Sequence, residues 1–178
     1  WLKVDSQGTD YRVFESLHPD VRSRVLALDI EPGLMDAYLG EDLFVEAHQK
    51  LVRSGFWLSN LDVQGTARMH EATVSHLLTS DQRLSKEGLM QAIRTSPGWV
   101  NARYLRTLPC LASAQCEPRQ YVLLWVFSLI DNQIGYAADI VFEYEKKFGH
   151  DNASRLMHAE TIGALQRLAQ RRRPNAIR

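Results

Sequence analysis

The side chains best suited to a chemical task lie between residues 60 and 104, where hydroxyl groups, an imidazole and several cations occur close together. Cationic side chains neutralise phosphates, and hydroxyl groups hydrogen-bond to phosphates or to base edges. Six phosphate contacts would make the affinity for nucleic acid fall steeply with salt. The cations that could make such contacts, if they share one face, are Arg68, Arg83, Lys86, Arg94, Arg103 and Arg106.

The apolar residues among these groups have the spacing of short helices that cross each other. In a helix-turn-helix the first helix supports the second across the DNA backbone, so apolar residues must occur where the two helices cross. Such positions are occupied by Val63, Ala67, Met69, Val74 and Leu77. Ser85 is placed to cap a third helix, whose inward-facing residues would be Leu89, Ala92 and Ile93. This spacing predicts a trihelical unit over residues 59–108.

Residues 60–104 resemble the DNA-binding headpiece of the LacI-type repressors. The resemblance rests on the Thr73-Val74-Ser75 step, which opens the recognition helix in that family, and on the Leu84-Ser85 step, which opens the next helix. It implies that a helix enters the major groove of DNA. The base-reading side chains that it implies are Glu71, Ala72 and His76, and those that it implies for phosphates or base edges are Thr73, Ser75 and Thr79.

A second interpretation of residues 66–79 stays open, in which they form an amphipathic helix buried on one side, the side of Ala67, Val74 and Leu77. The 21 Lys and Arg residues balance the 21 Asp and Glu residues, so no global field draws the molecule to nucleic acid. A helical module that binds another protein, such as an adaptor, a secretion-apparatus component or an effector, fits this composition equally well. Exposed Trp57 or Trp99 in an apolar groove would favour it.

No pattern in the sequence predicts catalysis, a cofactor or a metal site. His70 and His76 lack the His-Glu-x-x-His spacing of a zinc-binding helix. A cluster of His150 and His158 would require the turn at 149–152 to fold them together. The isolated glycines form no phosphate-binding loop, and no Gly-x-Ser-x-Gly elbow occurs. We therefore expect a protein that is not an enzyme and holds neither metal nor cofactor.

The cysteine content and the apolar stretches indicate a soluble protein of a reducing compartment. Cys110 and Cys116 have neither the spacing of a structural zinc site nor the density of a secreted disulfide scaffold. The most apolar stretch, Tyr121 to Ile130, covers ten residues, whereas a membrane-spanning helix needs about 20. We expect a cytoplasmic location and no contact with a membrane.

The elements that must position the candidate site are all expected to be helical, so the chain is predicted to be an all-α, multi-helix domain. Residues 1–18 have the composition of an extended lead-in, which could include a short strand near 11–14. Amphipathic helices are expected over 19–31 and 34–54. Beyond a connector at 110–118, a long helical hairpin is expected from 119 to 147 and from Asp151 or Asn152 to 173. The predicted parts are an N-terminal helical region (1–58), the trihelical unit (59–108) and the C-terminal hairpin (119–173).

The C-terminal hairpin also predicts a homodimer. Its first helix is apolar on most of its circumference and must be covered on several sides, either by the N-terminal helices or by a second subunit. The arginines at the end of the chain could be a solvated tail or an arm that grips phosphate; they are Arg167, Arg171, Arg172, Arg173 and Arg178. The sequence thus predicts a regulator that binds double-stranded DNA sequence-specifically through a helix-turn-helix, with the protein-binding module as the alternative.

Overall fold

A four-stranded sheet organises residues 2–106 in the computed structural model, which describes residues 1–35, 39–114 and 116–171. The protein is therefore mixed α/β, and the all-α prediction is wrong. The strands are β1 (Leu2–Lys3), β2 (Ala27–Ile30), β3 (Phe56–Thr66) and β4 (Ser96–Arg106). The helices are α1 (Asp10–Ser16), α2 (Pro19–Ser23), α3 (Phe44–Arg53), α4 (Glu71–Ser80), α5 (Lys86–Ala92), α6 (Leu108–Ser113), α7 (Pro118–Ile130), α8 (Ile134–Phe148) and α9 (Asn152–Arg171).

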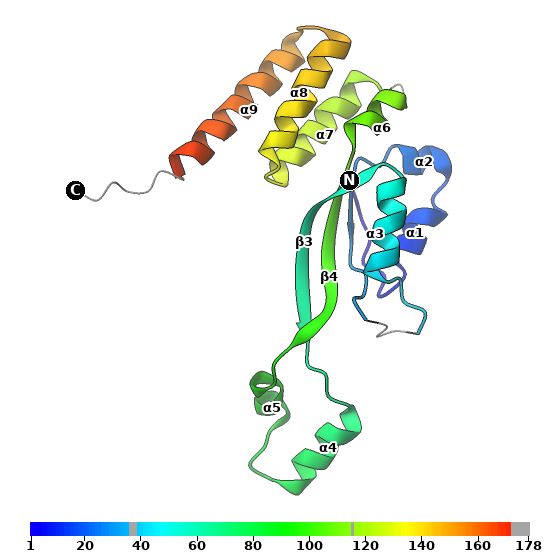
Figure 1. Cartoon of the computed structure of the whole chain (residues 1–178), viewed down its shortest axis with the longest axis vertical. Coiled ribbons are helices and arrows are strands. Elements are labelled where there is room, and N and C mark those ends of the chain that lie inside the picture. Colours follow the sequence, from blue (N-terminus) through cyan, green and yellow to red (C-terminus); the bar gives the residue numbers. More distant parts are fainter. Residues whose placement is uncertain (36–38, 115, 172–178) are drawn as a thin grey trace, which may run out of the picture.

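Three strands of the sheet run in one direction and the fourth runs against them. The order across the sheet is β1-β2-β4-β3, with β1 parallel to β2, and with β4 antiparallel to both β2 and β3. It follows that β3 is parallel to β1 and β2, although β4 separates it from them. The carboxyl ends of these three strands therefore point to the same end of the sheet, the end beyond which α4 and α5 lie (Figure 1).

Alternation of apolar and polar side chains explains why β4 is a strand. Val100, Ala102 and Tyr104 are buried, whereas Asn101 and Arg103 between them are partly exposed. A strand sends successive side chains to opposite faces, so this pattern buries one face and leaves the other polar. The helical prediction missed this period of two because it placed the apolar residues on helices.

In the described part of residues 1–58, strands β1 and β2, the start of β3, and helices α1, α2 and α3 are found where two long helices were expected. The helix predicted over 19–31 ends at Ser23, because the residues of β2 pair with β1 on one side and with β4 on the other. The helix predicted over 34–54 starts only at Phe44, as α3. Residues 11–14, considered for a strand, belong to α1. In the first segment, strand pairing replaces the end of the predicted helix. In the second, residues 34–35 and 39–43 are not helical, and residues 36–38 lie outside the described residues.

Helices cover the two faces of the sheet unequally. On the first face, α1 and α3 contribute Phe14 and Leu51 to a core that includes Tyr104 of β4. On the second face, α6, α7 and α8 pack against the sheet where Ala27 and Leu105 are buried. They cover only the part of this face near the amino end of β2. The part toward the carboxyl ends of β1 and β2 is left to polar side chains.

Three helices, rather than a hairpin of two, form the C-terminal part. The helix predicted over 119–147 is divided into α7 and α8 near Asn132, whose φ is 58°. Asparagine adopts this left-handed conformation more readily than most residues. Gly149, with a φ of 83°, ends α8 as the sequence predicts. The predicted cap at Asp151 is also confirmed, because its Oδ1 accepts a hydrogen bond from the Ser154 N–H at 2.8 Å.

The segment predicted as a trihelical unit is a β-hairpin with two short helices at its end. Its first and last parts belong to β3 and β4, so only α4 and α5 of the three expected helices are formed. Ser85 caps α5 as predicted, because its Oγ accepts from the Gly88 N–H at 3.0 Å. Residues 67–95, here called the hairpin tip, project beyond the sheet and away from the other helices (Figure 1).

Candidate functional site

An open groove of about 270 Å³ lies on the uncovered part of the second face of the sheet. Its polar side chains come from all four strands and from the residue that follows β2. We call it the polar groove; its lining consists of Lys3, Asp29, Glu31, Asn60, Asn101 and Arg103, together with Ile30 and Ala102.

Strand register brings these side chains to one face. Lys3 pairs with Asp29 between β1 and β2, Asp29 pairs with Arg103 between β2 and β4, and Asn60 pairs with Arg103 between β3 and β4. Residues opposite each other on neighbouring strands have side chains on the same face. The groove therefore lies beside the carboxyl ends of parallel β1 and β2, which is where open α/β sheets bind ligands.

Arg103 is at the centre of the charges in the polar groove. Its Nε donates to Asp29 Oδ1 at 2.7 Å, and its Nη1 donates to Asp131 Oδ1 at 2.8 Å. The hydrogen bond to Asp29, helped by Asp131, raises the pKa of Arg103 above its usual value. Trp1 Nε1 donates to the other carboxylate oxygen of Asp29 at 2.9 Å, and the guanidinium lies 4.7 Å from the centre of the Trp1 ring. Arg103 is thus held on several sides.

The groove has more negative than positive charge. Lys3 Nζ lies 3.5 Å from Glu31 Oε1, and Arg103 is shared between two carboxylates. Among the residues that the structure describes here, two cations therefore face three carboxylates. A phosphate or carboxylate ligand would find neither cation unpaired and would be repelled by the carboxylate in excess.

Two side-chain amides beside Arg103 have unused hydrogen-bonding capacity. Asn60 and Asn101 lie on neighbouring strands, and neither amide has a hydrogen-bond partner within the described ranges. Each amide offers two donor hydrogens and an acceptor oxygen. Asp131, whose side chain is only 4% exposed, also has a buried Oδ2 without a partner. Buried polar atoms are nearly always hydrogen-bonded, so this unused acceptor is unusual.

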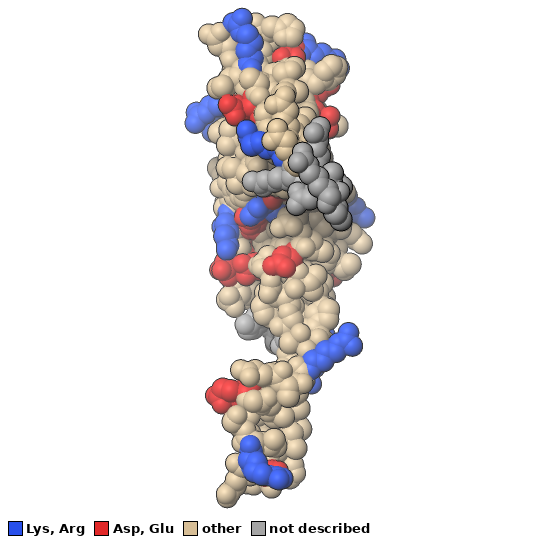
Figure 2. All heavy atoms as spheres, turned by 90° about the vertical axis from the view of Figure 1, so that its left-hand side faces the viewer, with Lys and Arg blue, Asp and Glu red and all other residues tan. Residues whose placement is uncertain are grey.

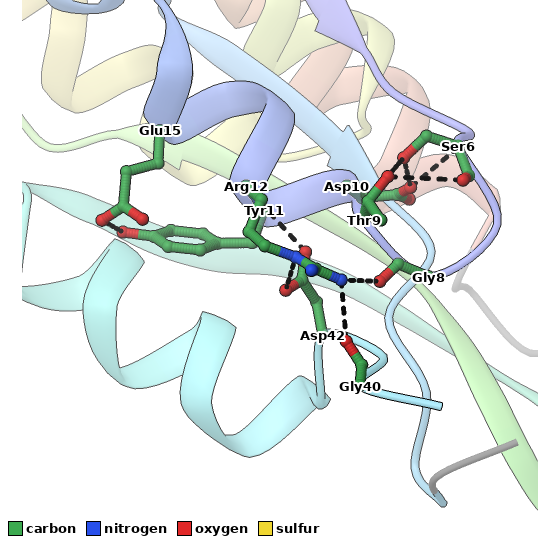
Figure 3. Close-up of polar contacts among 9 residues, drawn as sticks. All are labelled: Ser6, Gly8, Thr9, Asp10, Tyr11, Arg12, Glu15, Gly40 and Asp42. Carbon is green, nitrogen blue, oxygen red and sulfur yellow. Dashed lines mark hydrogen bonds and ion pairs between the residues drawn. The ribbon is translucent and has the colours of Figure 1, made fainter. Parts of the chain in front are cut away.

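Asp10 ties together the two loops that flank the polar groove, and Figure 3 shows its contacts with the first of them. It is 1% exposed, and its Oδ1 accepts hydrogen bonds from the backbone N–H of Ser6 at 2.8 Å and from the Ser6 hydroxyl at 2.6 Å. Its Oδ2 accepts from the backbone N–H of Glu31 at 2.7 Å. The loop after β1 is thereby fixed to the first residue after β2, which is itself part of the groove.

Arg12 and Asp42 make a second connection at the same end of the sheet (Figure 3). Arg12 Nε donates to Asp42 Oδ1 at 2.9 Å, and Arg12 Nη2 donates to the carbonyl oxygens of Gly8 and Gly40 at 3.0 and 2.7 Å. The Gly8 carbonyl also accepts from the Asp42 N–H at 2.8 Å. Gly8 has a φ of 96°, a conformation open to glycine at little cost. These contacts hold the loops in place without closing the groove.

No family model, no curated protein and no solved structure matches this chain. Within the described ranges, no helix is both long and apolar enough to cross a bilayer. The same residues contain no set of three His, Cys, Asp or Glu side chains that could hold a metal ion.

The structure places the side chains predicted to read bases on α4 in the hairpin tip. The predicted contact residues Glu71, Ala72, Thr73, Ser75, His76 and Thr79 are all exposed there, whereas Val74 is buried. One of the three hydroxyl groups predicted to touch DNA bonds within the helix, because the Thr79 hydroxyl donates to the Ser75 carbonyl at 2.8 Å. The candidate contacts of α4 therefore share one projecting element.

The cations of the hairpin tip are largely balanced by carboxylates. Lys86 pairs with Glu71 at 2.9 Å, and Arg83 pairs with Asp81 at 2.7 Å. Figure 2 shows blue and red side chains close together at this end of the molecule and no continuous blue patch. Arg68, predicted to contact phosphate, is exposed and has no ion pair among the described residues. The tip as a whole contains four cations and three carboxylates.

The other two cations predicted to contact phosphate lie outside the hairpin tip. Arg103 is in the polar groove, and Arg106 is buried with its guanidinium inside the protein. Arg106 donates to the carbonyl oxygens of Arg22, Val25 and Ser54 at 2.9 Å each, and it lies 3.8 Å from the centre of the Phe56 ring. It thus joins the ends of α2 and α3 to β4. The predicted basic arm beyond α9, residues 172–178, lies outside the described residues.

The polar groove was not predicted from the sequence. Its members are isolated residues of four strands, and only strand register brings them together. The period of two in β3 and β4, with Asn60 and Asn101 at polar positions, was the available signal.

His150 and His158, by contrast, are brought together by the turn that their cluster would require. The turn at 149–152 places both of them near Glu145, at 3.4 and 4.0 Å.

Proposed function

We propose that this chain binds a small, uncharged, polar molecule in the polar groove. The observation that carries the proposal is the pair of unused amides of Asn60 and Asn101 beside an arginine whose charge is already balanced. Ligand sites are concave and have a few convergent polar groups that fix orientation. Four strands supply such groups here, next to loops that Asp10 and Arg12 hold in place.

The charge balance of the groove favours a ligand that brings hydrogen-bond donors. Anions are disfavoured because Lys3 and Arg103 are paired and one carboxylate is in excess. The amides of Asn60 and Asn101 accept and donate equally well, which suits neutral groups that do both. Binding in this proposal involves no chemical step, in keeping with the predicted lack of enzymatic activity.

The proposal is tested by chemical-shift mapping on isotopically labelled protein. The probes are adenosine, D-glucose and myo-inositol at millimolar concentration, with inorganic phosphate as the anion. We expect at least one uncharged probe to shift the side-chain signals of Asn60, Asn101 and Arg103, and phosphate to leave them unchanged. Asn101→Ala should weaken that response, and Gln91→Ala on exposed α5 is the matched control. A response to phosphate alone, or to none of the probes, contradicts the proposal.

A second candidate function is the predicted contact with double-stranded DNA, now assigned to α4 in the hairpin tip. The specific observation in its favour is that α4 stands out from the body (Figure 1), and its hydroxyl-bearing side chains are exposed. Binding should weaken when salt is raised from about 50 to about 200 mM, measured by fluorescence anisotropy with duplex DNA. Replacing Arg68 and Arg94 by alanine should weaken it further. The control is Arg24→Ala with Arg119→Ala, two exposed cations elsewhere.

The homodimer predicted from the C-terminal helices also stays a proposal, as does the protein partner that fits the composition and balanced charge of the chain. The outer surfaces of α8 and α9 carry Phe142 and Leu156, which are 67% and 60% exposed. Light scattering behind a sizing column would show whether the protein is a dimer. Phe142→Ser should then shift a dimer toward monomer, whereas a monomer at all concentrations contradicts the prediction. The cytoplasmic location stays a prediction from the two cysteines.

A further inference from the structure

Trp99 places an aromatic surface on the same face as the polar groove. It lies two residues before Asn101 on β4 and is 38% exposed. Side chains two residues apart on a strand point to the same face and are spaced by about 7 Å. On the neighbouring strand β3, Gln64 pairs with Trp99 and Asp62 pairs with Asn101. The indole therefore extends the row of polar groups formed by Asn101 and Arg103.

We infer that the ligand of the polar groove is a nucleoside, whose base stacks on Trp99 and whose edge is read by the amides of Asn101 and Asn60. This inference rests on the proposed function and names its ligand class. Asparagine amides recognise base edges with a donor and an acceptor in one plane. Stacking on an aromatic ring is open to every base, because each has a π-face.

The arrangement of the polar groups favours a planar ring over a sugar alone. Asn101 and Arg103 follow Trp99 in a row along β4, and Asn60 lies opposite Arg103 on the neighbouring strand β3. A planar base presents its hydrogen-bonding groups along an edge, which such a row matches. The hydroxyl groups of a free hexose point outward around the ring and would need partners on several sides.

The charges of the groove indicate a nucleoside in preference to a nucleotide. A phosphate needs an available cation or several converging N–H donors. Lys3 is paired with Glu31, and the guanidinium of Arg103 is shared by Asp29 and Asp131. These ion pairs also disfavour the binding of single-stranded nucleic acid across this face, because its phosphate backbone would lie against carboxylates.

The experiment measures the binding of adenosine and uridine to the full chain by calorimetry and by chemical-shift mapping. Trp99→Ala should weaken nucleoside binding by about 5- to 150-fold, the range for one stacked base. Asn101→Ala should weaken it by a similar factor, about 5- to 150-fold. Trp99→Phe keeps an aromatic surface and should retain most of the affinity, and Gln91→Ala should bind as the unaltered protein does. Circular dichroism establishes that each variant is folded.

The outcomes separate this inference from the function on which it rests. The inference is supported if adenosine and uridine shift the NMR signals of Trp99 and Asn101 and bind more tightly than adenosine monophosphate does. If D-glucose or myo-inositol shifts the groove amides and the nucleosides do not, the nucleoside is wrong and the polar-ligand site stands. If Trp99→Ala leaves nucleoside affinity unchanged, stacking is refuted. If none of these compounds shifts the groove residues, both proposals fail.

Discussion

Replacing Asp10 by alanine should destabilise the protein and disturb the polar groove at once. The buried carboxylate accepts from the backbone N–H groups of Ser6 and Glu31, and alanine would leave both without that acceptor. A buried donor left unsatisfied costs about 1–3 kcal/mol, so the two together predict a loss of about 2–6 kcal/mol in the free energy of unfolding. Small domains have only about 5–15 kcal/mol in total. Asp10→Asn keeps one acceptor oxygen and should lose about half as much.

The loss is measured by urea unfolding followed by circular dichroism. Asp20→Ala is the matched control, because the Asp20 side chain is 80% exposed, and it should change the free energy of unfolding by less than about 0.5 kcal/mol. Hydrogen exchange adds a local measurement: the Glu31 amide should lose protection in Asp10→Ala. The reasoning is refuted if Asp10→Ala is as stable as the Asp20 variant, or if the Glu31 amide stays protected.

Three further predictions follow from other parts of the fold. Arg106→Lys should lower the free energy of unfolding by about 2 kcal/mol or more, because one ammonium group cannot replace a guanidinium that donates to three carbonyl groups. Urea unfolding measures this loss of stability. Burial raises the pKa of Tyr11 to about 12, whereas the pKa of a tyrosine in the unfolded chain is about 10. The stability that neutral Tyr11 gives to the folded state is therefore complete below pH 10 and is lost as pH rises toward 12. Ultraviolet titration should show late tyrosinate formation that coincides with unfolding, and early formation before any unfolding would count against it. Replacing residues 67–95 by a short turn between the paired ends of β3 and β4 should leave the sheet intact and shift the melting temperature little, because Val74 is the buried apolar residue of that segment. Far-ultraviolet circular dichroism measures both the sheet signal and the melting temperature. Loss of cooperative melting would disprove this prediction.

Local signals in the sequence predicted the ends of elements better than their type. The caps at Ser85 and Asp151 and the stop at Gly149 are found where they were expected. Each depends on one or two neighbouring residues, such as a hydroxyl or carboxylate that accepts from the first turn of a helix. These interactions are decided within a few residues, so they can be predicted without knowledge of the fold.

The strands depend on pairing between distant residues and were missed. Ala27–Ile30 contains three fully buried residues and gives a short apolar run that fits a helix or a strand equally well. Its strand conformation is decided by β4, which lies more than 70 residues later in the chain. The two long strands do alternate, but their apolar residues also fit the spacing of a trihelical unit and were predicted to be helical. Strand register, which no single segment contains, is also what assembles the polar groove.

The candidate site divides in the same way. Predicted contacts that follow one another along α4, such as Thr73 and His76, do share one exposed element. The phosphate contacts predicted for Arg103 and Arg106 are not on that element, because both residues belong to β4. An arginine in a sequence can neutralise a phosphate, pair with acids or fasten helix ends, and only its neighbours in space decide among these roles.

The position of β4 has a consequence for the way the protein is made. This strand leaves the ribosome after the other three, yet its place is between β2 and β3. Until residue 106 has been synthesised, β2 and β3 have no strand to join them, and each exposes an edge that could pair with another chain. Contacts between residues so far apart in sequence slow folding, because a long loop must close before they form. The native order of strands therefore forms only after residues 67–95 and the whole of β4 have been synthesised.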